Sequence, residues 1–518
     1  MAALIALLLS ALAVQPADGA PARSVAVSQE AVEAALSQAG DHRPALESFL
    51  ARADACDDAQ KQLAARWLIA NMPGHGFAEY ALVDASGARH AFNPMDHPDL
   101  AAAEAALKAI QDAHPGADFK VVTFTPDLAV VDVEWLWKDL ELAFATWRTR
   151  PWCRNVDFPT FVERILPYRG SNEPLQPWRE ECQARLAPVL AALPPDATLA
   201  QVAAAATGAA HGWVGFSDRY YLHPTDQGWA DMRASRLGRC EDITNAISFA
   251  MRAAGAVGSG DWTPWWADRD NNHAWEVTLD EHGRGHAGLS NRAAKVYRRS
   301  FGARPESLAS RRQKEEEIPP VFRSRAMEDV TEQYVPVSTV TVALAPPAPG
   351  APVPGAGHAY ACVFNGGEWR PIAWAPVQQG EAAFERLGRN VLYLPAWYLD
   401  GAARPAGAPR LLHPDGRVEL LEADGPAVDV ELSALRPETP DADTRVARPR
   451  LHVKAGAEPE LMVWRNGAWQ SLGTRRVPEE GSVTFTGVPG GALLWLVTPD
   501  TREVARPFTL DGTRQVFW

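Results

Sequence analysis

The fold is decided by residues 237–280, which read LGRCEDITNAISFAMRAAGAVGSGDWTPWWADRDNNHAWEVTLD. Apolar residues in the first half recur at helical spacing, at positions Ile243, Ile247, Ala250, Met251 and Ala254. Gly255 follows directly and predicts the end of this helix. Cys240 is therefore expected in the first turn. There, free N–H groups and the positive end of the helix dipole favour a thiolate and can hold an oxyanion.

The acidic pair Glu241–Asp242 opposes a thiolate, because both side chains place negative charge beside the sulfur. A nearby imidazolium would offset this charge, and His273 is the candidate. Its segment alternates strictly, so His273, Trp275, Val277 and Leu279 share one face of a predicted strand. We expect that face to pack on the cysteine helix. A Cys–His pair of this kind performs nucleophilic catalysis on an amide or ester.

Several short motifs resemble those of the transglutaminase-like superfamily. One motif consists of GRC, an acidic residue, Asn245 and then a strand that opens with HAW. This motif is similar to that family and to peptide N-glycanases. The segments DNNHAWEV (270–277), AAKVYRRSF (293–301) and ILPYRGSNEPLQPWR (165–179) resemble a secreted bacterial branch in which β-sandwich modules follow the core. The resemblance implies an α+β, papain-like core, in which the helix with Cys240 packs on an antiparallel sheet with His273.

This chain departs from the family pattern at the third catalytic position. The resemblance implies an Asp roughly fifteen to eighteen residues after the histidine, which would orient the imidazole. This chain has Asn291 there, eighteen residues after His273. Asn serves that role in papain-like enzymes, so Asn291 is either the orienting residue or an ordinary loop residue. Both interpretations stay open.

Aromatic and charged residues flank the predicted pair. Trp262 and Trp266 are expected to wall the substrate cleft, whereas packing at the sheet edge is favoured for Trp265. Arg239 could hold a substrate carboxylate, but its position favours a pair with Asp242.

The remaining segments suggest a division into five parts. We expect a signal peptide at 1–20, a helical region at 21–124, the core at 125–332, a β-sandwich module at 333–435 and a β module at 436–518. Both NGGEW (365–369) and RNGAW (465–469) carry an Asn-Gly hairpin signal. The APPAPGAPVPGAG stretch at 345–357 predicts a long loop.

Composition narrows the function classes. The net charge of −14, without a basic patch interleaved with aromatics, excludes a typical nucleic-acid binder. The apolar run Ala2–Val14 has signal-peptide length, so we expect a secreted, periplasmic or cell-surface protein with no membrane span after processing. The five cysteines include no CxxC pair and no HExxH occurs, so neither a zinc site nor another cofactor is predicted.

The sequence therefore predicts a secreted, transglutaminase-like cysteine enzyme that acts on amide bonds. Hydrolysis and acyl transfer on a peptide, glycopeptide or protein substrate are equally compatible with the residues. The alternative is a catalytically silent module of the same fold that binds cell-surface or polysaccharide targets through its β modules.

Overall fold

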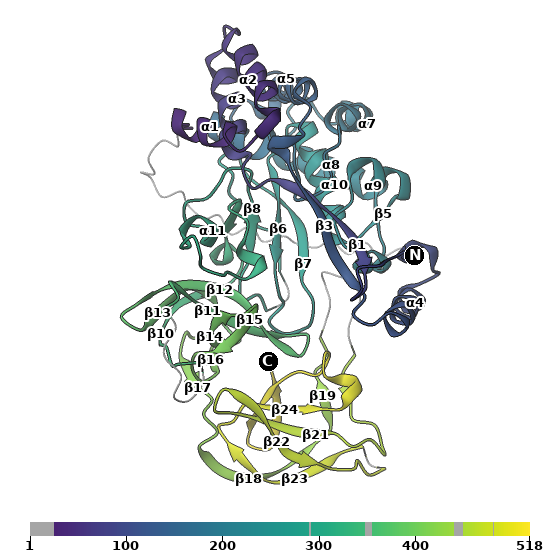
Figure 1. The fold of residues 1–518 in the computed structure, drawn as a ribbon, viewed down its shortest axis with the longest axis vertical. Coiled ribbons are helices and arrows are strands. Elements are labelled where there is room, and N and C mark those ends of the chain that lie inside the picture. The colour runs from purple at the N-terminus through teal and green to yellow at the C-terminus, as the bar shows by residue number, and fades with distance from the viewer. Residues whose placement is uncertain (1–24, 290–291, 348–354, 440–448, 480) are drawn as a thin grey trace.

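The computed structural model describes residues 25–289, 292–347, 355–439, 449–479 and 481–518. The fold is mixed α/β, with 32% helix and 30% strand. Helices gather at the N-terminal end and sheets at the C-terminal end (Figure 1), which confirms the predicted order of the two. The predicted signal peptide at 1–20 lies outside the described residues.

The helices form two packed groups that meet at one central helix. In the described residues they are α1 Gln29–Leu36, α2 Arg43–Asp54, α3 Ala59–Asn71, α4 Leu100–Ala113, α5 Val133–Thr149, α6 Phe158–Thr160, α7 Arg179–Ala191, α8 Leu199–Trp213, α9 Trp229–Ser235, α10 Cys240–Ala254 and α11 Leu308–Arg311. Phe49, Phe144 and Phe161 anchor the first core, and Leu186 and Ile247 belong to the second. No helix in the described part of the chain is both long and apolar enough to cross a bilayer.

The central sheet carries α10 on one face. Its strand order is β7-β6-β8-β9, with β6 Gly258–Thr263, β7 His273–Thr278, β8 Tyr297–Arg299 and β9 Met327–Asp329. A short parallel pair, β4 Gly215–Phe216 and β5 Leu237–Gly238, precedes the helix. The helix approaches β6 closely, because a Cβ atom on Gly260 would lie 2.8 Å from Cγ2 of Thr244. Only glycine leaves room for this contact.

A hairpin arm departs from the expected helical region at 21–124. It contains β1 Gly76–Val83, β2 Arg89–His90 and β3 Asp118–Pro126 in the order β2-β1-β3, with α4 between the second and third strands in sequence. A helical region was predicted here, so these three strands are a correction to that prediction. Val121 and Phe124 on this arm are 53% and 55% exposed.

The first C-terminal module is one strongly curved sheet, where a sandwich was predicted. Its strands are β10 Val337–Ala343, β11 His358–Asn365, β12 Glu368–Gln378, β13 Glu381–Gly388, β14 Val391–Leu399, β15 Ala402–Pro405, β16 Arg410–Leu412 and β17 Val418–Leu420. The order β10-β13-β12-β11-β14-β16-β17 has β10 and β17 at its ends, and both contribute to one small interior space beside Val340 and Val418. The sheet therefore forms a nearly closed barrel.

The last module begins earlier than the predicted position 436. Its strands are β18 Gly425–Leu432, β19 Ala434–Arg436, β20 Leu451–His452, β21 Glu460–Arg465, β22 Ala468–Thr474, β23 Val483–Gly490, β24 Leu494–Val497, β25 Phe508–Asp511 and β26 Arg514–Phe517. Strand β18 pairs with β23 and packs in the core of this module, so the boundary lies before Gly425.

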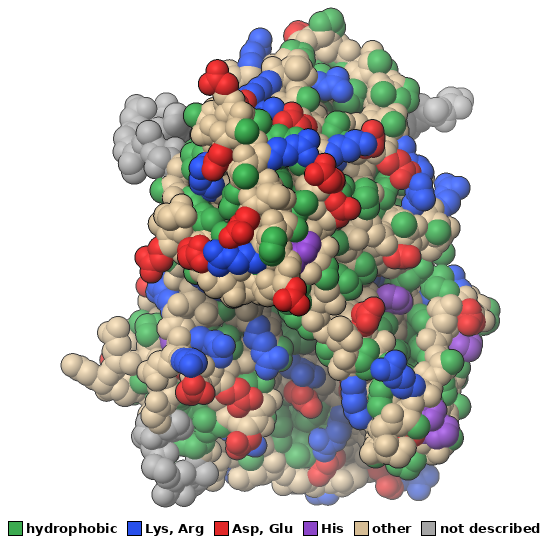
Figure 2. All heavy atoms as spheres, turned by 45° about the horizontal axis from the view of Figure 1, so that its top comes forward, with side chains coloured by type: hydrophobic (Ala, Val, Ile, Leu, Met, Phe, Trp, Pro, Cys, Tyr) green, Lys and Arg blue, Asp and Glu red, His purple; other side chains and the backbone are tan. Residues whose placement is uncertain are grey.

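Both Asn-Gly signals form tight hairpin turns, as predicted. Gly366 and Gly367 turn between β11 and β12 with φ of 60° and 77°, and Asn466 and Gly467 turn between β21 and β22 with φ of 52° and 76°. On the outside of the molecule, basic and acidic side chains are mixed over the face drawn in Figure 2.

Candidate functional site

The start of α10 is held by a buried carboxylate. Asp242 accepts hydrogen bonds from the backbone N–H of Arg239 at 3.0 Å and from that of Gln227 at 2.8 Å. Gly238 must be glycine, because a Cβ atom there would lie 2.5 Å from Cβ of Asp242. Cys240 is consequently the first residue of the helix, as the sequence predicts.

The Cys240 sulfur lies against the edge of the central sheet. Strand β7 is the edge strand, and the backbone N–H of Ala274 donates a hydrogen bond to Sγ of Cys240. The sulfur therefore lies beside the peptide group that joins His273 to Ala274. The thiol is 7% exposed and donates to Oε2 of Glu241 at 3.1 Å.

The surroundings of Cys240 favour the neutral thiol. Burial raises the pKa of Cys240, and the adjacent Glu241 raises it further through its charge and by accepting a hydrogen bond from the S–H group. The Ala274 N–H and the Arg239 guanidinium lower this pKa, but by less. The lowered pKa expected from the helix N-terminus is therefore wrong for this conformation, because desolvation and a local carboxylate outweigh the dipole.

The glycines of β6 define which face of the sheet α10 covers. Gly258 and Gly260 both face the helix, since a Cβ atom on either would collide with it. Gly260 pairs with Glu276 of β7, and cross-strand partners point to the same face. Glu276 indeed lies 3.9 Å from His211 of α8, on the helical side.

His273 consequently points to the opposite face. Its cross-strand partner is Thr263, and its ring lies near the rings of Trp275 and Trp266, with centroids 5.5 and 6.1 Å apart. The prediction that the face of His273 and Trp275 packs on the cysteine helix is wrong. The Cys240 sulfur instead contacts the backbone of β7 at the strand edge, while the His273 ring lies beside Trp266 and Trp275 on the other face of the sheet.

A buried network holds Trp275, the neighbour of the His273 ring. Nε1 of Trp275 donates to Oη of Tyr334 at 3.1 Å, and that hydroxyl donates to Oδ2 of Asp261 at 2.6 Å. Arg298 forms two hydrogen bonds with the same carboxylate, at 2.9 and 2.8 Å. The fully buried Asp261 is thereby satisfied, and the indole ring is fixed.

The loop that leads to His273 is anchored by the barrel. Asn365 is 3% exposed, and its Nδ2 faces three carbonyl oxygens, those of Trp266 at 3.1 Å, Arg269 at 2.9 Å and Asn271 at 2.9 Å. Its Oδ1 accepts the Asn271 N–H at 3.1 Å. One side chain from the β11–β12 hairpin therefore sets the course of residues 266–271.

The last module contributes a second anchor to the same loop. The Arg506 guanidinium is buried and donates to the carbonyl oxygens of Ala267 at 2.7 Å and Phe364 at 2.6 Å. Both C-terminal modules thus contact the histidine loop directly.

The remaining predicted residues have different outcomes. Asn291 lies outside the described residues. Trp266 is 1% exposed, so its ring belongs to the core beside His273 and offers no open surface for the predicted contact with substrate. Trp262 is half-buried, with its ring centroid 5.8 Å from that of Tyr297.

The predicted ion pair between Arg239 and Asp242 is also wrong. The Arg239 guanidinium donates to Asp226 at 2.8 Å and lies 3.2 Å from Glu241, whereas only its backbone meets Asp242. Asp226 in turn accepts from Ser171 at 2.5 Å. Sequence reasoning missed Asp226, because nothing local in the chain marks it as a partner of the GRC motif.

The segment 165–179 acts as a buried scaffold beside α10. Ser171 accepts from Nδ2 of Asn245 at 2.8 Å, one turn after Cys240. Arg179 pairs with buried Asp139 through contacts of 2.9 and 3.0 Å, which pins the end of the segment. This is the stretch whose resemblance was noted in the sequence, so that resemblance was the available signal for Ser171.

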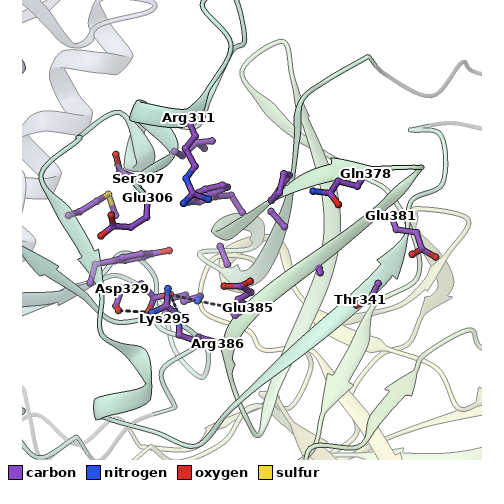
Figure 3. Close-up of a pocket in the computed structure, with 18 of the residues that line it drawn as sticks. Lys295, Glu306, Ser307, Arg311, Asp329, Thr341, Gln378, Glu381, Glu385 and Arg386 are labelled. Atoms are coloured by element: carbon purple, nitrogen blue, oxygen red, sulfur yellow. Dashed lines mark hydrogen bonds and ion pairs between the residues drawn. The ribbon is translucent and has the colours of Figure 1, made fainter. Parts of the chain in front are cut away.

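A separate cavity of about 740 Å³ lies between the central sheet and the barrel. Lys295, Asp329 and Arg386 lie together in it, and Nζ of Lys295 donates to Asp329 at 2.5 Å and to the carbonyl oxygen of Glu385 at 2.7 Å (Figure 3). Burial lowers the pKa of Lys295. Cys240 and His273 do not line this cavity.

The arrangement at Cys240 provides a nucleophile at a helix start, an imidazole on the adjoining strand and rigid anchors around both. Such a set can attack a carbonyl carbon and transfer a proton to the leaving group. Comparison with family models, characterised proteins and solved structures gave no match to this chain.

Proposed function

We propose that this chain is a transglutaminase-like cysteine enzyme with a papain-like core that acts on amide bonds outside the cytoplasm. Cys240 is the nucleophile and His273 the general base and acid. One observation carries the proposal, namely that the sulfur at the first turn of α10 lies beside the His273–Ala274 peptide. Substrates are peptides, glycopeptides or proteins with an accessible amide.

In the proposed reaction, His273 takes the thiol proton as the Cys240 sulfur attacks the substrate carbonyl carbon. The C–N bond then breaks, and the histidine returns the proton to the departing amine. This leaves a thioester on Cys240. Water or a second amine attacks that thioester, so hydrolysis and acyl transfer share the first half-reaction.

Backbone groups can support the developing negative charge. The N–H groups of the first turn of α10 point towards the helix N-terminus, where they can donate to an oxyanion. The dipole of this helix acts in the same direction.

Glu241 acts as a restraint on the resting nucleophile. Its carboxylate accepts a hydrogen bond from Sγ of Cys240 at 3.1 Å and is itself 3.2 Å from Nε of Arg239. A thiolate beside this charge is costly, so His273 takes the proton only as the new S–C bond forms. The free enzyme is therefore expected to carry a neutral thiol.

Acylation by p-nitrophenyl acetate tests the proposal without knowledge of the natural substrate. We expect a burst of nitrophenolate and the mass of one acetyl group on Cys240 in the intact protein. Cys240→Ala should abolish the burst, and His273→Ala should slow acylation by about 10²–10⁴-fold, the usual contribution of a general base. Cys56→Ala is the matched control, because Cys56 is also a free thiol and is more exposed than the buried Cys240. An unchanged burst in Cys240→Ala contradicts the proposal.

The second candidate is a silent module that binds peptide or polysaccharide. Two observations favour it: the raised pKa of Cys240, and the cavity beside the barrel, where Trp374 and Tyr297 lie among charged side chains. Aromatic rings among polar groups are typical of sites that bind sugars and peptides. Binding of glycan or peptide that is lost in Trp374→Ala, together with the absence of any acyl-enzyme, would favour this candidate.

A further inference from the structure

Three potential metal ligands converge at the far end of the hairpin arm. Asp84 follows β1, His90 lies on β2, and His114 directly follows α4. One ligand atom from each lies within 4.8 Å of the other two. Five residues separate the first two ligands and twenty-three separate the last two. This spacing matches no short zinc motif, so the cluster could not be recognised from the order of residues.

Hydrogen bonds from its own turn fix the orientation of the Asp84 carboxylate. Its Oδ1 accepts three hydrogen bonds, from the N–H of Ser86 at 2.8 Å, the hydroxyl of Ser86 at 2.7 Å and the N–H of Ala88 at 3.0 Å. Oδ2 is left to face Nε2 of His90, at 2.8 Å. Asp84 is 8% exposed, so the carboxylate is held in place by its own turn.

An ordinary Asp–His pair accounts for His90 but not for His114. The two imidazole rings lie with centroids 3.9 Å apart, although protonated rings at this distance would repel each other. Among the described residues, no side chain or backbone group forms a hydrogen bond with the His114 ring. His114 also caps the C-terminus of α4, where the negative end of the dipole favours a cation.

We propose that Asp84, His90 and His114 bind a zinc ion. Two imidazole nitrogens and one carboxylate oxygen form a ligand set that zinc accepts in tetrahedral geometry, with water in the fourth position. Zinc–ligand bonds of about 2.0–2.2 Å place neighbouring ligand atoms roughly 3.3–3.5 Å apart. The 2.8 Å contact between Asp84 and His90 therefore opens by well under 1 Å on binding.

The ion would join the end of α4 to the β1–β2 turn, where the backbone N–H of Ala85 already donates to the carbonyl oxygen of Pro115 at 3.1 Å. The main nearby cation is Lys120, whose ammonium donates to the backbone oxygen of Asp84 at 3.3 Å. It thus faces the backbone and leaves the carboxylate oxygen available.

Isothermal titration of the full chain with ZnCl₂, in the Cys240→Ala background, tests the site. That background removes zinc binding to the Cys240 thiol. We expect one zinc ion per chain. Both His90→Ala and His114→Ala should weaken binding at least 100-fold, while circular dichroism confirms that each variant is folded. Cobalt substitution should give visible bands without sulfur-to-metal charge transfer, since no thiolate is among the ligands.

His97→Ala is the matched control, because His97 belongs to the same arm but is outside the three-residue cluster. It should bind zinc with unchanged affinity. The inference is overturned if the parent chain binds no zinc, or if zinc binding survives unchanged in both His90→Ala and His114→Ala. It is also overturned if His97→Ala loses binding to the same extent.

Discussion

Asn365 offers the sharpest test of how the barrel supports the histidine loop. The change Asn365→Ala removes a buried amide that faces three carbonyl oxygens and accepts one N–H. An amide has two N–H donors, so about three hydrogen bonds are lost. At roughly 0.5–1.5 kcal/mol each, with buried partners left unsatisfied, the free energy of unfolding should fall by about 3 kcal/mol.

The same change should also slow chemistry at a distance. The loop over 266–271 ends beside His273, so its release should move the imidazole from its place beside Trp266 and Trp275. We expect acylation by p-nitrophenyl acetate to slow at least tenfold at a temperature where the variant is fully folded. Urea unfolding followed by tryptophan fluorescence measures the stability term.

The matched control is Asn172→Ala, because Asn172 is exposed and its side chain forms no hydrogen bond within the described residues. It should change stability by less than about 0.5 kcal/mol. If Asn365→Ala lowers stability as expected but leaves the acylation rate at the parent value, the barrel does not position His273. If neither quantity changes, the geometry of the anchored loop is wrong.

Three further predictions concern the thiol and the helix contact. Glu241→Gln should lower the pKa of Cys240 and speed its alkylation by iodoacetamide about tenfold at pH 8, since one unit of pKa changes the thiolate fraction tenfold. An unchanged alkylation rate would show that the carboxylate does not act on the sulfur. In the parent chain the alkylation rate should keep rising with pH beyond pH 9, because a raised pKa keeps the thiol protonated below it; a plateau near pH 6 would instead reveal a preformed thiolate–imidazolium pair. Gly260→Ala should lower the free energy of unfolding by about 1–3 kcal/mol, because its Cβ meets Thr244. Gly208 lies within α8, where an added Cβ atom would meet no other atom, so Gly208→Ala should raise the free energy of unfolding by about 0.5–1 kcal/mol. Equal urea midpoints for the two variants would contradict this packing argument.

Local patterns predicted much of the site. The apolar spacing after Cys240 and the glycine at 255 correctly placed both ends of α10, where Gly255 adopts φ of 79°. Alternation correctly placed a strand that begins at His273. These features depend on residues that are close together in the sequence, so the local pattern of residue types is enough to predict them.

Strand alternation divides side chains into two faces but does not say which face a helix will cover. The choice here rests on Gly258 and Gly260 of β6, whose missing side chains admit α10, and β6 imposes it on β7 through their register. The partner of Arg239 was decided in the same way, because Asp226 reaches it only after residues 215–238 have folded back.

The sequence by itself determined the two ends of α10, the strand of His273, both tight hairpin turns and the order of helices before sheets. Only the tertiary structure decided the direction of the His273 ring, the pKa of Cys240, the anchoring of the loop by Asn365 and the closure of the barrel. The physical reason is the separation along the sequence of the residues that interact. Helix and turn formation depends on nearby residues, whereas burial, charge pairing and sheet closure depend on groups brought together from distant parts of the chain.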